Sequence, residues 1–111
     1  MTCRRWDVIA VSFPFLEGTD SKRRPALIVS TDRLEKEQGL HWIAIITTAK
    51  SRSGSDDIAV TDRERAGLPE DCVIRVARLA TVSDMQIVRR LGEIVPKDRN
   101  AVLSLLRRYA A

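Results

Sequence analysis

The chain has 111 residues, 44% of them hydrophobic and 31% charged, a balance typical of one globular domain spanning residues 1–111 and not of a disordered segment. The net charge of +4 favours a negatively charged partner, nucleic acid first, although arginines that only solvate the surface would give the same charge. No apolar run approaches the ~20 residues of a membrane helix, and the start lacks the pattern of a secretory signal, so we expect a cytoplasmic protein without a membrane partner.

The first half of the chain is expected to form three strands, over residues 6–13, 26–30 and 41–47. Pro14 ends the first strand, and a polar loop follows over residues 15–24. Proline cannot donate to a strand ladder, so we place Pro25 at the start of the second strand. A short helical turn over residues 33–38, ended by Gly39, then leads into the third strand.

The second half adds strands over residues 58–61, 72–82 and 87–95, with one helical turn over residues 62–68. The alternation of the long strand loses phase near Ala77 and Arg78, which predicts a bulge there. Pro96 opens the one long helix, Asp98 complements its positive end, and the apolar stripe consists of Val102, Leu105, Leu106 and Tyr109. Five or six short strands and a terminal helix predict a mainly β fold, a small barrel with a C-terminal helix.

Three ordered segments resemble the MazF/PemK toxin family. Residues 7–15 (DVIAVSFPF) are the first, and residues 22–30 (KRRPALIVS) resemble the K-x-R-P-A-L-V-x-S signature of that family. Residues 44–48 (AIITT) are similar to its apolar-apolar-Ile-Thr segment. Weaker matches follow at residues 67–69 (GLP), at residues 89–94 (RRLGEI) and in the terminal helix. Together these segments cover the chain from about Trp6 to Tyr109.

This resemblance implies an SH3-like barrel of the MazF/CcdB type and the toxin component of a type II toxin–antitoxin system. Such toxins are endoribonucleases that cleave single-stranded messenger RNA without a metal or another cofactor. They are usually homodimers, and an antitoxin protein neutralises them by placing an acidic, disordered segment in the RNA groove.

Metal-free RNA cleavage uses the ribose 2′-OH as the nucleophile and leaves a 2′,3′-cyclic phosphate and a 5′-OH. It requires a base, an acid and fixed donors for the charge that grows on the phosphate. Arg24 suits the last role, because its guanidinium stays protonated and presents a planar fork to phosphate oxygens. Thr47 matches the family threonine and can donate from its hydroxyl, and Thr48 is the nearby alternative.

The proton-transfer groups stay open. Glu17 and Asp20 are candidates in the first loop, where many relatives carry a Ser-Glu pair, although a solvated loop would explain both carboxylates. His41 is the only histidine, which excludes a two-histidine mechanism within one chain. Ala77 stands where relatives often have an acidic residue. The scattered carboxylates do not indicate a two-metal nuclease, and Cys3 and Cys72 lack metal-ligand spacing, so no metal site is predicted.

RNA binding is expected from basic side chains in two loops: Lys22, Arg23, Lys50 and Arg52. These would contact phosphates without reading the base sequence. Phe15 is a candidate stacking platform for a base, although a core position would explain it equally well.

Two alternatives remain open. A toxin of the CcdB type shares this fold but poisons gyrase through protein contacts and is not an enzyme. A catalytically weak family member would bind only RNA or the antitoxin. The Arg-Pro-Ala-Leu element favours the nuclease, because it is the part that would touch phosphate.

Overall fold

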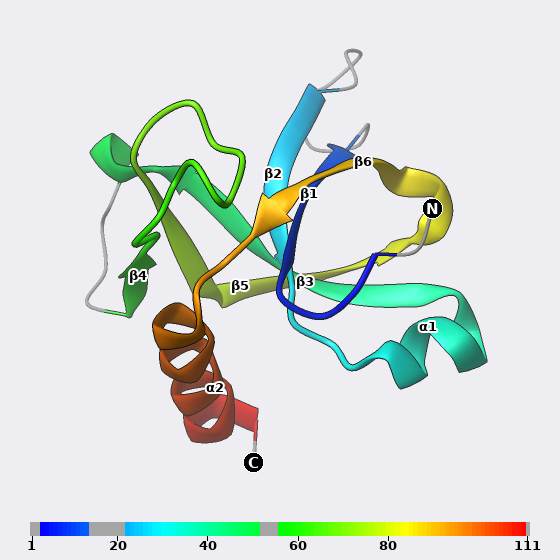
Figure 1. Cartoon of the computed structure of the whole chain (residues 1–111). Coiled ribbons are helices and arrows are strands. Elements are labelled where there is room, and N and C mark those ends of the chain that lie inside the picture. Colours follow the sequence, from blue (N-terminus) through cyan, green and yellow to red (C-terminus); the bar gives the residue numbers. More distant parts are fainter. Residues whose placement is uncertain (1–2, 14–21, 52–55, 111) are drawn as a thin grey trace.

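The computed structural model describes residues 3–13, 22–51 and 56–110. Its strands are β1 (Asp7–Phe13), β2 (Lys22–Ile28), β3 (Leu40–Thr48), β4 (Asp57–Ala59), β5 (Cys72–Ser83) and β6 (Ile87–Glu93). Its α-helices, labelled in Figure 1, are α1 (Asp32–Gln38) and α2 (Pro96–Ala110). Two short 3-10 helices are η1 (Ala49–Ser51) and η2 (Asp84–Gln86). No helix in this part of the chain is both long and apolar enough to cross a membrane.

The strands form one antiparallel sheet in the order β4-β5-β3-β2-β1-β6. β1 lies between β2 and β6, so the last strand of the chain returns to the side of the first. The sheet curls, but its edge strands β4 and β6 do not pair with each other in the described residues (Figure 1). The mainly β architecture with a C-terminal helix is as predicted, and the barrel is an open one.

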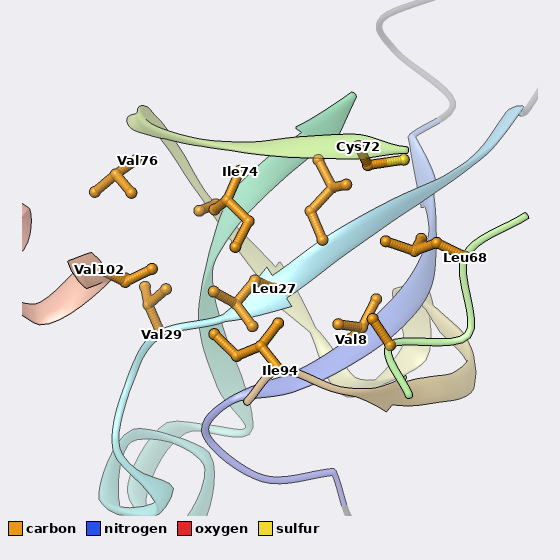
Figure 2. Packing of buried hydrophobic residues seen from close by; sticks show 12 residues of the cluster. Val8, Leu27, Val29, Leu68, Cys72, Ile74, Val76, Ile94 and Val102 are labelled. Carbon is orange, nitrogen blue, oxygen red and sulfur yellow. The ribbon is translucent and has the colours of Figure 1, made fainter. Parts of the chain in front are cut away.

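Both faces of the sheet carry buried residues, because successive side chains along a strand point to opposite faces. Val8 and Leu27 point into one buried cluster, which Val102 of α2 completes (Figure 2). Ile9 and Ile28, their neighbours in the sequence, belong to a second cluster on the other face. Both faces of the first strand are therefore covered.

The prediction that Pro25 opens its strand is wrong. β2 begins at Lys22, and Pro25 lies inside it, opposite Ala10 of β1. The pairing of β2 with β3 starts only at Ala26, so among the described strands the first half of β2 has β1 as its one neighbour. Such a stretch is locally an edge, where the missing N–H of proline breaks no ladder.

The bulge predicted in the long strand is confirmed. Ala44 of β3 pairs with Leu79, whereas the next residue, Ile45, pairs with Arg75, so residues 76–78 are passed over. The short turn after β2 is also confirmed as α1, and Gly39 ends it in the left-handed conformation.

The terminal helix begins at Pro96 as predicted, but two of its residues have other partners than expected. The buried carboxylate of Asp98 accepts hydrogen bonds from the N–H and hydroxyl of Thr61, at 2.8 and 2.7 Å. Tyr109 does not join the apolar stripe, since 56% of it is exposed and its hydroxyl donates to Asp56. The helix is therefore fastened to the chain that follows β4 by a buried polar contact.

Two glycines bring the turn before β5 into backbone contact with β6. A Cβ on Gly67, whose φ is +74°, would lie 2.1 Å from the carbonyl oxygen of Leu91. A Cβ on Gly92 would lie 2.1 Å from the carbonyl oxygen of Arg65. That same oxygen accepts a hydrogen bond of 3.1 Å from the N–H of Glu93. This contact determines where residues 68–70 leave the turn.

We expect Gly92→Ala to lower the free energy of unfolding by about 1–3 kcal/mol, because the added methyl group forces two backbones apart in a packed region. Chemical denaturation of the variant and the parent protein measures the difference. An unchanged denaturation midpoint would contradict the close packing of this turn.

Candidate functional site

A pocket of about 400 Å³ opens where β2 and β3 part. Three segments line it: residues 23–25 of β2, residues 46–48 of β3, and residues 68–70, with Cys72 at the start of β5. In Figure 1 the segment between β4 and β5 arches beside this end of the sheet. Arg24 and Thr47, the two residues predicted for catalysis, are both in its lining.

The register of the two strands explains why these two residues line the same pocket. Ala26 pairs with Ile45, and the same antiparallel register carried two residues further places Arg24 opposite Thr47. Residues opposite each other on neighbouring antiparallel strands project from the same face. The pairing itself ends at Ala26 and Ile45 although both strands continue, which leaves room for the pocket.

The floor of the pocket is the end of the hydrophobic core. Ile46, Leu68 and Cys72 are buried members of the first cluster, and Figure 2 shows Leu68 and Cys72 at one end of it. Close-packed side chains of this kind hold their positions. The polar residues around the pocket therefore rest on a rigid base.

The polar lining is mostly a set of donors. Arg23 is exposed, whereas Arg24, Thr47 and Thr48 are half-buried. Two arginines and two threonines thus line one cavity. Glu70 is the acidic residue in this lining, and it is exposed.

Cys72 contributes a neutral thiol to the pocket. Burial raises the pKa of this thiol above its usual range, and the nearby carboxylates of Glu70 and Asp71 raise it further. Its Sγ donates to the carbonyl oxygen of Glu70 at 3.3 Å. A thiol that stays protonated at neutral pH is neither a nucleophile nor a metal ligand.

Of the other predicted site residues, the structure places only the side chain of Lys50, and it places it outside this pocket. Lys50 is exposed in η1, two residues beyond Thr48, and does not line the cavity. The backbone of Lys22 lies in β2, two residues before Arg24, but its side chain is outside the described part of the structure. The remaining predictions, Phe15, Glu17, Asp20 and Arg52, also lie outside the described residues.

Two positions singled out in the sequence lie elsewhere. His41 is buried, and its Nε2 lies 2.6 Å from Oδ1 of Asp84, so it has a partner that the sequence did not indicate. Ala77 is exposed within the bulge of β5 and does not line the pocket. Within the described ranges, no three His, Cys, Asp or Glu side chains are grouped so that they could hold a metal ion.

Residues 68–70 are the part of the lining that sequence reasoning missed. The Gly-Leu-Pro motif at residues 67–69 is a weak family match to which the sequence assigns no role. Its glycine makes the close approach to β6, and its next two residues enter the pocket. A motif of glycine and proline ahead of a strand was the available signal.

The comparison with solved structures finds the same fold at low sequence identity. An endoribonuclease in complex with its cognate antitoxin from a mycobacterial species has a TM-score of 0.73 and 18% identity, over 96% of this chain and 90% of that one. Toxin MazF-mt6 of Mycobacterium tuberculosis has a TM-score of 0.73 and 18% identity, over 92% and 93%. MazF from Deinococcus radiodurans has a TM-score of 0.77 and 15% identity, over 97% and 96%. Among curated proteins there is no significant match.

The model of one protein family matches almost the whole chain, from residue 4 to residue 110. With the open six-stranded sheet, the terminal helix and the pocket between β2 and β3, this match establishes the relationship that the sequence motifs indicated. The chain belongs to the family of PemK-like, MazF-like toxins of type II toxin–antitoxin systems.

Proposed function

We propose that this protein is an endoribonuclease that cleaves single-stranded RNA without a metal, and that the pocket between β2 and β3 is its active site. The observation that carries this proposal is the joint placement of Arg24 and Thr47 in one cavity of about 400 Å³. Its floor is buried core, so the two donors are aimed by a rigid scaffold. Donors fixed in advance are what a transition state with growing negative charge requires.

In the proposed reaction the 2′-oxygen of the ribose attacks the adjacent phosphorus, and the bond from phosphorus to the 5′-oxygen breaks. The products are a 2′,3′-cyclic phosphate and a 5′-OH. Arg24 holds two phosphate oxygens with its fork of N–H groups, and Thr47, with Thr48 as the alternative, donates from its hydroxyl. Because the attack is intramolecular, correct positioning supplies much of the rate.

Positively charged side chains near the pocket would attract the phosphates of the RNA strand. Arg23 is exposed in the pocket lining, and Lys50 is exposed just beyond Thr48. Lys22 and Arg52 stay predicted phosphate contacts, and Phe15 stays a predicted stacking platform. Contacts of this kind position the RNA backbone, and other groups select the bases.

We expect Arg24→Ala to lower the cleavage rate about 10²–10³-fold, the usual loss when one preorganised donor to a developing oxyanion is removed. Purified protein and a long single-stranded RNA in excess EDTA provide the assay. Arg89→Ala is the matched control, since Arg89 is exposed on β6 and does not line the pocket.

The absence of discrete cleavage by the parent protein in EDTA would overturn the nuclease proposal. If the parent protein instead inhibited gyrase supercoiling without cutting RNA, the CcdB-type alternative would take its place. Equal cleavage by Arg24→Ala would remove this arginine from the mechanism.

The partner we infer is an antitoxin with an acidic segment. Solved structures similar to this chain include an endoribonuclease with its cognate antitoxin and MazE–MazF complexes from Deinococcus radiodurans. An acidic segment would match the guanidiniums of Arg23 and Arg24, and it would exclude RNA by occupying the same pocket. The toxin would act in the cytoplasm, where messenger RNA is found.

We also infer a homodimer, from an apolar hollow on another part of the surface. Trp42 of β3 and Leu79 of β5 are 52% and 48% exposed, and they line a hollow of about 410 Å³ together with Leu34 and Leu106. Large exposed apolar side chains gathered in one place are typical of a protein interface. A second copy of the chain is the occupant we propose.

Light scattering should therefore give twice the mass of one chain at micromolar concentration. We expect Leu79→Asp to shift the protein to a monomer, because the buried interface would then hold an unpaired charge. Met85→Asp is the control, since Met85 is 95% exposed outside the hollow. A monomeric parent protein would contradict the dimer.

A further inference from the structure

The pocket holds one carboxylate, that of Glu70, among the described residues that line it. Glu70 lies in the short segment between the turn at Gly67 and the start of β5. It enters the pocket from a different segment than Arg24 on β2 and Thr47 on β3. A substrate held between these segments would have donors on two strands and an acceptor on the third wall.

The other polar groups of the lining are poor proton acceptors at neutral pH. An arginine guanidinium offers N–H donors and no acceptor, and a threonine hydroxyl is not a base. The Cys72 thiol is kept neutral, since burial raises its pKa. Of the side chains in this lining, the carboxylate of Glu70 is thus the one chemically suited to accept a proton from an RNA hydroxyl.

The carboxylate is also available. Within the described part of the chain, no hydrogen bond or ion pair engages the side chain of Glu70, and only its backbone carbonyl is used, by the Cys72 thiol. By contrast Glu93, on β6, is bonded by the guanidinium of Arg65 at 2.7 Å. A carboxylate without a structural partner is free to act on a ligand.

The segment that carries Glu70 is firmly placed. The backbone contact of Gly67 with Leu91 fixes its start, and the side chain of Leu68 is buried in the core. At its other end, the N–H of Ala49 donates to the carbonyl oxygen of Asp71 at 2.9 Å, which ties the segment to the end of β3. An active residue on a loop is usually held by such a scaffold.

We propose that Glu70 is the general base of the cleavage reaction, an inference that rests on the proposed nuclease function. The proton of the ribose 2′-OH passes to a carboxylate oxygen of Glu70 while the 2′-oxygen forms its bond to phosphorus. The bond to the 5′-oxygen breaks, and that oxygen takes a proton from water. The carboxyl group then returns its proton to the solvent, so the step consumes no further reactant.

The test is the single-turnover cleavage rate of an RNA oligonucleotide that spans a site cut by the parent protein, in EDTA, from about pH 4 to 9. The parent rate should rise with pH and then level off, which is the profile of a reaction that needs a deprotonated base. We expect Glu70→Gln to lower the plateau about 10²–10⁴-fold and to abolish the rise, because an amide of the same shape accepts no proton. Glu70→Asp should keep the rise at a lower rate.

Binding and stability separate this role from a merely structural one. The Kd for the same oligonucleotide with a 2′-deoxy sugar at the cleavage position should be equal in Glu70→Gln and the parent protein, and so should the denaturation midpoint. Glu64→Gln is the matched control, since Glu64 is exposed in the preceding turn and does not line the pocket. It should cleave at the parent rate.

The outcomes distinguish the two proposals. If the parent protein cuts RNA and Arg24→Ala does not, but Glu70→Gln cuts at the parent rate, then Glu70 is not the base and the nuclease function stands. A weaker Kd with an unchanged rate in Glu70→Gln would make it a substrate-binding group and would also overturn the proposal. If the parent protein cuts no RNA, both proposals fail.

Discussion

The candidate site depends on one constraint, which is that the pairing between β2 and β3 stops before either strand ends. The two strands stop pairing with each other at Ala26 and Ile45, yet each still pairs with its other neighbour beyond that point. β1 continues to pair with the first half of β2, where Val11 lies opposite Arg24. β5 continues to pair with β3, where Val73 lies opposite Thr47. The two walls of the pocket are therefore rigid although no ladder joins them, which is what preorganised donors need.

The third wall depends on a contact between backbones. Most neighbouring segments in a protein are kept apart by at least a Cβ atom, but Gly67 and Gly92 let a turn and a strand meet directly. This contact lies far in the sequence from β2 and β3, and it brings residues 68–70 to their end of the sheet. The pocket thus combines a strand register with a glycine contact, and a change in either would separate its donors from its acceptor.

The arginines of this basic chain do not all lie at the pocket. Arg65, Arg90 and Arg99 surround the carboxylate of Glu93, with nearest contacts of 2.7, 3.1 and 3.5 Å. The hydrogen bond from Arg65, together with the charges of these arginines, holds the pKa of Glu93 below its usual range. These three arginines belong to a cluster of ion pairs around Glu93, and Arg23 and Arg24 line the pocket. Net charge alone therefore indicates the class of partner but not where on the protein that partner binds.

Much of the fold was predictable from local patterns. The first strand, the stop at Gly39, the loss of phase near Ala77 and the opening of the helix at Pro96 all appear in the structure as expected. Each of these signals is local, because strand period, backbone conformation and helix capping depend on a few neighbouring residues. Arg24 and Thr47 were found through motifs, and the motifs did not say that the two would face each other.

What only the tertiary structure decided is which distant segments meet. The entry of Glu70 into the pocket, the buried contact between Asp98 and Thr61, and the place of Pro25 inside a strand all depend on partners far away in the chain. Local propensity carries no information on such partners, since register and backbone contact arise only when the sheet is assembled. By itself the sequence determined the elements, the family resemblance and the residues suited to the chemistry. Their assembly into one cavity followed from the packing of the sheet around its core.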